Sequence, residues 1–532
     1  MKTIKQFILI FTILLFVVGC DDNFEAINTD PYQINDIEAS LIFAGSQRTG
    51  TGGWGAENTI VQHYVNPYNT GATLGFNFNE NIDAQQNGAF GNYTRSIKEF
   101  THILNNMLGD DTDRINLKSM VRIWKAQVFM IMVDAYGDIP YFEAGKAIDG
   151  KEYFYPSYDD DEAIYEDLHK ELKEAVASLS SGGEFVEADL FYGINGAVPS
   201  TSAAQQVAKW QKLGNSLLLR LGMRYTKVNS ALAQTIVNEA VNGPGGVMTS
   251  NNDNAFVRYD GSLFTNGSNN TLIAFPYFHH AAEPFVEQLK TTNDPRGKYL
   301  VASFEDPADP LADPNPDYDI ANQFGVPVGV EAIALGAAPY RGLKAGGLNY
   351  SEMNVNCGAS ILAPTFWVTY SQTSLLLAEA VVRGYISGSA QAYYEDGITA
   401  NMDVYATYIT ETGSTLPEVS LAEKTSYLSD ANVDFTLAVS DQDKIDLISI
   451  QYWITNIKNP AEAWANMRRS NHSNISRNSF NNDLLANGGD GFVHRFTYPD
   501  SEQSANPVNY SAAVSAIGGK DDLVTRIFWD VE

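Results

Sequence analysis

The stretch that decides the fold is "SLLLAEAVVRGYISGSAQAYYEDGITANMDVYA", residues 374–406. Apolar side chains recur at the spacing of one helix face before Gly388 and again after it, which predicts two helices joined by a turn at that glycine. The first predicted face contains Leu375, Ala378, Val382 and Tyr385, and the returning face contains Ala392, Tyr394, Ile398 and Met402. Two adjacent amphipathic helices with a short turn favour an antiparallel pair that buries both faces.

Small residues where the two helices would cross, with aromatic residues beside them, resemble one tetratricopeptide hairpin, although no strict 34-residue period is visible. The first half of the chain is also strongly helical. Residues 156–179 and 203–228 both carry apolar stripes, and we expect Ser157 to cap the first of these helices and Val228 to end the stripe of the second. A third stripe runs along the segment that "YGDIPY" terminates, where we expect Pro140 to break the helix: Leu117, Val121, Trp124, Val128, Ile131 and Ala135.

Helical periodicity is lost between residues 242 and 364, where Gly, Asn, Pro and Asp are dense. The segment "EDPADPLADPNPDYD", residues 305–319, has four prolines and lacks the spacing of a calcium-binding EF-hand, so we expect a solvated loop. We therefore predict a mainly α protein in five parts. These are a signal peptide (1–19), a tether (20–36), an N-terminal helical part (37–241), a loop-rich mixed region (242–364) and a C-terminal helical part (365–532).

The N-terminus has the pattern of a bacterial lipoprotein. Lys2 and Lys5 precede an apolar run, residues 7–18, that is shorter than the roughly 20 residues needed to cross a bilayer. Gly19 and Cys20 follow, so we expect cleavage before Cys20 and acylation (palmitate or a related chain) of that cysteine. The polar stretch "DDNFEAINTDPYQIND" would then be a flexible tether to the outer membrane, and its acidic start resembles a surface-export signal of Bacteroidetes lipoproteins.

Composition excludes several classes of function. The formal net charge is −30, from 64 acidic and 34 basic residues, which disfavours binding to a nucleic-acid backbone. With Cys20 acylated, Cys357 has no partner for a disulfide, and we expect it to be a small buried apolar side chain.

The motifs of common cofactor and metal sites are absent or out of context. "GTGGWG", residues 50–55, matches G-x-G-x-x-G, but a helical pattern rather than a strand precedes it. The seven histidines show no zinc-binding spacing, and we expect structural roles for His279 and His280. We therefore expect no cofactor, no metal and no catalytic residues.

Rings and amides gather in "GGWGAENTIVQHYVNPYNTGATLGFNFNENID", residues 52–83. Aromatic rings pack on the apolar face of a sugar and amides bond its hydroxyl groups, so this composition suits a carbohydrate. The same rings are also consistent with anchoring a long loop to the body of the protein. As ligand contacts we predict Trp54, Tyr68, Asn69, Phe76, Asn77 and Phe78.

Eight stretches in order along nearly the whole chain resemble the SusD/RagB family of nutrient-binding outer-membrane lipoproteins of Bacteroidetes. They include the lipoprotein N-terminus, "AQVFMIMVDAYGDIPYFEA", "KWQKLGNSLLLRLGMR", "NDPRGKYL", "LLLAEAVVRG", "AQAYYEDGITANM", "IQYWITNIKNPAEAWANMRRS" and "FTYPDSEQSANPVNYSAAV" followed by "FWD". Tyr498, Pro499, Glu502 and Asn506 match the family's C-terminal run, whereas Phe528 and His494 depart from it. Within "NPAEAWANMRRS" we expect Trp464 in the core, with Arg468 and Arg469 tying helix ends or acidic residues.

This resemblance implies a helical body with tetratricopeptide-like pairs and a TonB-dependent (SusC-like) transporter barrel as partner. It implies a surface receptor that captures an oligosaccharide, or in some relatives a peptide, and transfers it to that barrel. Two alternatives stay open: a lipid-anchored glycan hydrolase, for which the abundant Asp and Glu are the sole argument, and a scaffold that binds only proteins.

Overall fold

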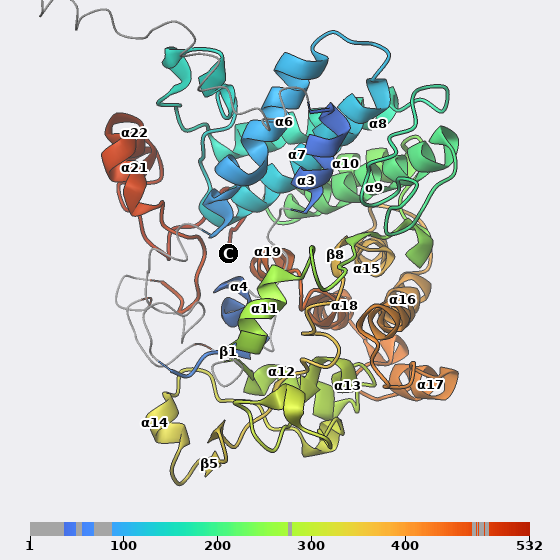
Figure 1. Ribbon diagram of the computed structural model, residues 1–532, viewed down its shortest axis with the longest axis vertical. Helices are drawn as coiled ribbons and strands as arrows, with labels where there is room; N and C mark the ends of the chain where they lie inside the picture. Colours follow the sequence, from blue (N-terminus) through green and yellow to red (C-terminus); the bar gives the residue numbers. More distant parts are fainter. Residues whose placement is uncertain are drawn as a thin grey trace, which may run out of the picture.

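The computed structural model describes residues 37–48, 56–68, 88–274, 279–470, 475, 477, 484 and 489–532. Cys20 and the tether lie outside the described residues. Figure 1 shows helices α3 and α6 to α10 in the upper half of the molecule and helices α11 to α18 in the lower half. The fold is mainly α with little sheet, as predicted.

The upper half is built on three long helices that pack in chain order: α7 (Ile115–Tyr136), α8 (Asp161–Ser178) and α9 (Ala203–Arg224). Helix α7 lies between other elements, so most of its residues are buried and not only the predicted stripe. It ends before Pro140 is reached, because Gly137 adopts a left-handed φ of 77° where a side chain would press on Ile527.

Two local predictions in this half are wrong. Asp160, not Ser157, caps α8, and its side chain accepts a hydrogen bond from the Ala163 N–H at 3.0 Å. Helix α9 ends at Arg224, so Val228 lies in the connection to α10 (Ser230–Asn242) and is 40% exposed. The chain leaves α9 in turns after Arg224, and Asn229 then caps α10 by accepting a hydrogen bond from the Leu232 N–H at 3.1 Å.

The predicted helical pair is present as α15 (Tyr370–Val382) and α16 (Ala390–Thr412). Gly397 lies where they cross, and a side chain there would come within 2.8 Å of Leu375 Cγ, which explains the small residue. Tyr385 lies beyond the end of α15 but is still buried.

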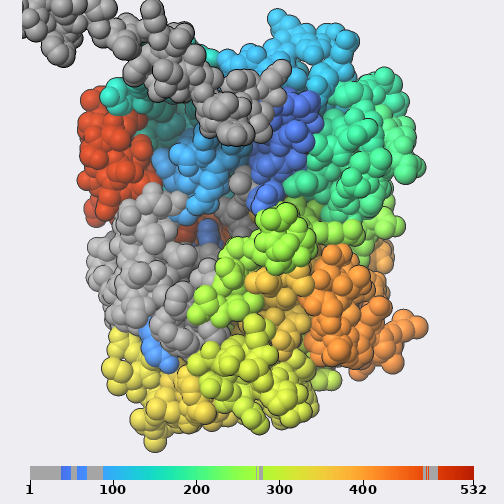
Figure 2. Space-filling model, in the orientation of Figure 1, coloured from blue at the N-terminus to red at the C-terminus, as the bar shows by residue number. Residues whose placement is uncertain are grey.

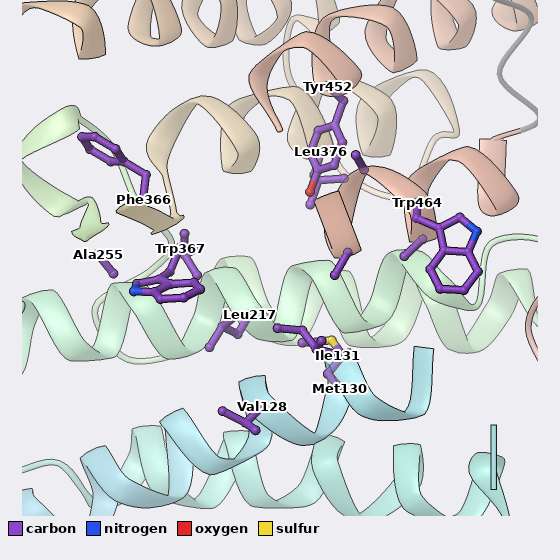
Figure 3. Packing of buried hydrophobic residues seen from close by; sticks show 14 of the residues in the cluster. Val128, Met130, Ile131, Leu217, Ala255, Phe366, Trp367, Leu376, Tyr452 and Trp464 are labelled. Carbon is purple, nitrogen blue, oxygen red and sulfur yellow. The ribbon is translucent and has the colours of Figure 1, made fainter. Parts of the chain in front are cut away.

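The core lies where the two halves meet. Figure 3 shows Val128 of α7 and Leu217 of α9 in the layer between these two helices, with Leu376 and Trp464 of the C-terminal helices on the other side of α9. Those helices are α15, α18 (Asp441–Thr455) and α19 (Pro460–Ser470), which pack together. Trp464 is 1% exposed, as predicted for a core residue.

Buried arginines join these helices. Arg224 contacts Asp134 at 3.1 Å and Glu462 at 2.6 Å, and Arg469 binds Glu379 through two N–H groups. Arg468 donates to the backbone carbonyls of His494 and Asp134, at 2.6 and 2.7 Å. The prediction that Arg468 and Arg469 tie helix ends or acids is confirmed.

The lower half contains the sheet. A four-stranded sheet has the antiparallel order β1-β3-β7-β4, from β1 (Tyr64–Val65), β3 (His280–Ala281), β7 (Glu352–Met353) and β4 (Val301–Ala302). We call residues 279–353 the sheet lobe. The predicted loop at 305–319 is mostly exposed and has one short turn, Pro310–Ala312. Cys357 is fully buried, and burial raises the pKa of its thiol to about 12.

The remaining elements are short. They are α3 (Ala39–Gln47), α4 (Ala56–Ile60), α6 (Lys98–His102) between two π-helical turns, β2 (Ala255–Val257) paired with β8 (Thr365–Val368), α11 (Gly267–Ala274), α12 (Glu283–Thr291), α13 (Gly297–Leu300), α14 (Ala332–Leu335), β5 (Leu343–Lys344) paired with β6 (Gly347–Leu348), α17 (Leu421–Leu428), α21 (Asp500–Ala505) and α22 (Pro507–Ala516).

Candidate functional site

Tyr68 is the predicted contact residue that the structure places. It follows β1, and the carbonyl of the preceding Pro67 accepts a hydrogen bond from the Ala332 N–H at 2.9 Å. The half-buried ring of Tyr68 packs on a small apolar cluster that includes Leu335 and Tyr350. The start of the predicted ring-rich loop is therefore attached to the sheet lobe.

The other predicted contacts, Trp54, Asn69, Phe76, Asn77 and Phe78, lie outside the described residues and stay predictions. The described chain stops at Tyr68 and resumes at Gly88. Close to that second end, the Phe90 N–H donates to the Tyr136 hydroxyl of α7, in the upper half. The two ends of the segment 69–87 thus lie in different halves of the molecule.

Two further exposed rings of the sheet lobe, Phe324 and Tyr340, were not predicted from the sequence. Phe324 is 36% exposed, with the Arg341 guanidinium 3.4 Å from its ring centroid and Lys290 Nζ at 4.4 Å. Tyr340 is 37% exposed. These residues are isolated in the sequence, so no local pattern marks them.

The rings of the lobe share one framework. Arg341 donates from its backbone N–H to the Tyr350 hydroxyl at 3.4 Å and from Nε to the Asn349 carbonyl at 2.8 Å. Tyr350 belongs to the cluster under Tyr68. We call Tyr68, Phe324, Tyr340 and Arg341 the ring surface. Figure 2 shows the sheet lobe, coloured yellow-green to yellow, at the lower edge of the molecule.

Behind the ring surface, the strand β7 buries Glu352. Neither of its carboxylate oxygens has a hydrogen-bond partner among the described residues, and Lys344 Nζ and the Nδ1 atom of the His280 ring lie 3.6 and 3.7 Å away. Burial raises the pKa of Glu352 to about 8, although Lys344 opposes the shift. At neutral pH the lobe therefore presents rings and hydrogen-bond donors, while its buried acid is mostly protonated.

Acidic residues also gather at the start of α8. Carboxylate oxygens of Asp138, Asp160 and Asp161 lie within 4.8 Å of one another, the sole group of this kind in the described part of the chain. Asp161 Oδ2 accepts from the Phe528 N–H at 2.9 Å, and Asp138 accepts from the Asp161 N–H at 3.0 Å. Burial raises the pKa of Asp161 to about 7. These bonds join α8 to the C-terminal segment, which is a structural role.

Within the ranges that the structure describes, no helix is both long and apolar enough to span a bilayer.

Comparison with known proteins agrees with this fold. No curated protein matches the chain. Among solved structures, a chitin-binding protein aligns with TM-score 0.74 at 26% identity and covers 93% of this chain and 100% of its own. A SusD homologue from Bacteroides fragilis NCTC 9343 aligns with TM-score 0.71 at 22% identity, over 93% of this chain and 100% of its own.

A chitin-binding SusD homologue from Flavobacterium johnsoniae aligns with TM-score 0.68 at 21% identity, over 93% of this chain and 95% of its own. A SusD-like family model, described as starch-binding and associating with the outer membrane, matches residues 31–499. The resemblance seen in the sequence is therefore confirmed, and the chain belongs to the SusD-like family of carbohydrate-binding proteins associated with the outer membrane.

Proposed function

We propose that the protein is a cell-surface lipoprotein that captures an oligosaccharide and delivers it to a TonB-dependent outer-membrane transporter. The observation that carries this proposal is the family match over residues 31–499. The exposed rings of the sheet lobe support it, because aromatic rings and planar polar side chains are what a sugar ring packs on and bonds.

The ligand class is a neutral glycan. The family description names starch, and the similar structure at 26% identity is a chitin-binding protein, so glucose and N-acetylglucosamine oligomers are the first candidates. The net charge of −30 disfavours long-range attraction of polyanionic glycans.

The protein acts by binding rather than by turnover. A glycosidase needs two carboxyl groups that face each other across the sugar. The buried acids Glu379 and Glu462 are instead held by Arg469 and Arg224 inside the helical core. The ring surface lies apart from those pairs, in the sheet lobe.

In this proposal, the acylated Cys20 anchors the protein to the outer membrane, where its partner transporter also lies. Two or more acyl chains hold a protein stably on a membrane, and the tether of residues 20–36 would let the receptor reach a transporter in the same membrane. Co-purification from native membranes tests this part of the proposal. A large β-barrel is expected with the protein, and its absence under mild detergent would contradict the delivery role.

Isothermal titration calorimetry of the delipidated chain tests the capture role against chitin oligomers, maltooligosaccharides and oligopeptides. Saturable binding of one neutral glycan series is the expected result. Binding of peptides alone would identify the protein as a peptide-binding member of the family, and no binding to any of the three by folded protein would contradict the proposal.

A further inference from the structure

A cavity of about 320 Å³ lies at the end of α19, apart from the ring surface. Met467, Arg468, Asp490, Phe492, His494 and Arg526 belong to its lining. Figure 1 marks the C-terminus beside α19, and the C-terminal residues Asp530 and Glu532 also line the cavity. This volume is close to the lower end of ordinary small-molecule sites.

One wall of the cavity is apolar. Phe492 is half-buried and Met467 is 8% exposed, so both side chains offer carbon surface to the cavity. A ring in this position can pack on the CH face of a pyranose.

The charged side chains of the lining are hydrogen-bonded to one another. Arg526 donates to Asp530 at 2.9 Å and to Asp490 at 3.0 Å. The His494 ring nitrogens lie 2.5 Å from Asp530 and 3.1 Å from Asp490. The Asp490 side chain is 37% exposed and that of Arg526 is 29% exposed, so these two form the accessible rim.

The rim retains hydrogen-bonding capacity. A guanidinium has five N–H groups, and within the described chain Arg526 uses two of its groups on the two aspartates. The remaining donors of Arg526 and the carboxylate of Asp490 can bond neighbouring hydroxyl groups of a sugar, one as donor and the other as acceptor.

The floor of the cavity is rigid. Arg468 is 3% exposed, and its guanidinium lies 4.1 Å from the Trp464 ring centroid and 4.7 Å from that of Trp529. Its Nε–H has no hydrogen-bond partner in the described residues. Because Arg468 is held between two indole rings before a ligand binds, little conformational entropy is lost on binding.

The polar lining combines the carboxylates Asp490, Asp530 and Glu532 with the guanidinium groups of Arg468 and Arg526 and the His494 ring. Hydroxyl groups both donate and accept hydrogen bonds, so a neutral sugar fits this mixed lining.

Helix α4 packs against α19 and leads through β1 to Tyr68 of the ring surface.

We propose that this cavity is a subsite for one neutral sugar unit, with Phe492 as the packing ring and Asp490 and Arg526 as the polar contacts. The inference rests on the proposed capture of an oligosaccharide, and it assigns part of that binding to residues near the C-terminus.

The test is calorimetry of chitohexaose and maltohexaose with the wild type, Phe492→Ala, Arg526→Gln and Asp490→Asn. Phe154→Ala is the matched control, because Phe154 is 53% exposed and does not line the cavity. We expect each cavity variant to weaken the sugar that the wild type binds by about five- to tenfold, and the control to bind as the wild type does.

Hydrogen exchange provides a readout that does not depend on how well the variants fold. Saturating sugar should slow amide exchange in the wild type over residues 490–494 and 526–530. Wild-type affinity in all three cavity variants, or protection confined to other segments, would overturn the subsite and leave the capture role intact. A wild type that binds neither sugar nor any other glycan would overturn both.

Discussion

Two buried glutamates, one in the helical core and one in the sheet lobe, have opposite electrostatic environments. Glu379 of α15 is held by two hydrogen bonds from Arg469 and one from Arg383 at 2.7 Å. Burial raises its pKa, but the two arginines outweigh burial and lower the pKa to about 2. Glu352 of β7 has no such donor, and burial raises its pKa to about 8. Glu379 is therefore fully paired, whereas Glu352 has no hydrogen-bond partner among the described residues, although another buried acid of the lobe, Asp294, is paired with Arg296 at 2.6 Å.

The helices α15, α18 and α19, which we call the frame, thus differ from the sheet lobe in how their buried acids are held. Bidentate arginine–carboxylate pairs fix the crossing of α15 and α19 and require both partners. The inner part of the lobe, with Phe285 and Leu300, belongs to the main core, whereas its outer part, with Leu335 and Tyr350, rests on a separate small apolar cluster. We infer that the frame supports the fold and that the lobe carries the ligand preference.

The largest effect is expected from Arg469→Met. The substitution leaves Glu379 buried with Arg383 as its remaining cation, and breaking a buried pair in this way lowers the free energy of unfolding by about 3–5 kcal/mol. Chemical denaturation measures the change. Lys444→Met is the control, because its partner Asp441 is exposed and such a pair contributes about 0–1 kcal/mol. An equal loss in the free energy of unfolding for the two substitutions would contradict a larger contribution from the buried pair.

Glu352→Gln should have a smaller effect of the opposite sign. The folded-state pKa of Glu352 is above its unfolded value, so the folded protein binds more protons between pH 5 and 8 and loses stability as the pH rises. The amide cannot ionise, and we expect it to raise the free energy of unfolding at pH 8 by about 1–2 kcal/mol and to flatten the pH dependence. Denaturation at pH 5, 6.5 and 8 checks this result, with the exposed Glu287→Gln as control.

The contribution of Glu379 to stability should change with pH in the opposite direction. Its contribution is present above pH 4.5 and is lost as the pH falls toward 2, because its folded-state pKa is lowered. The same pH dependence of stability between pH 5 and pH 8 in the wild type and in Glu352→Gln would contradict the environment assigned to Glu352.

Tyr68→Ala tests the lobe as a ligand surface. The ring is half-buried on the small cluster, so we expect a loss of about 1 kcal/mol in stability and a weaker affinity for the captured glycan. Calorimetry gives the affinity and thermal denaturation gives the stability. Tyr155→Ala is the matched control, since Tyr155 is 64% exposed and lies outside the ring surface. An unchanged glycan affinity in Tyr68→Ala would show that Tyr68 does not contact the glycan.

The smallest effect on stability is expected from Trp54→Ala, with a clear loss of ligand affinity. The other six tryptophans are buried, and Trp464→Ala should lower the free energy of unfolding by about 3–5 kcal/mol. Differential scanning calorimetry of both variants makes the comparison. A melting point for Trp54→Ala as low as that of Trp464→Ala would show that Trp54 belongs to the core.

Much of the helical core could be predicted from the sequence, because helix periodicity and small crossing residues are local. The stripe from Leu117 to Ala135 and the turn at Gly388 are examples. The cap at Asp160 was missed because three adjacent aspartates and Ser157 offer equivalent side chains, and the backbone alone selects among them.

The ring surface could not be predicted beyond Tyr68. Arg341 meets the ring of Phe324 and the hydroxyl of Tyr350 through irregular segments, which leave no periodic signal in the sequence. The same holds for the cavity at α19, whose ring and rim come from residues 490 to 526.

The central claim is capture without cleavage, and one incubation tests it most directly. Purified protein is saturated with the glycan that it binds, binding is followed by calorimetry, and the sugar is recovered and sized by chromatography. We expect saturable binding and sugar that is recovered at full length. Shortened products that disappear when a single carboxylate is substituted would contradict it and identify a hydrolase.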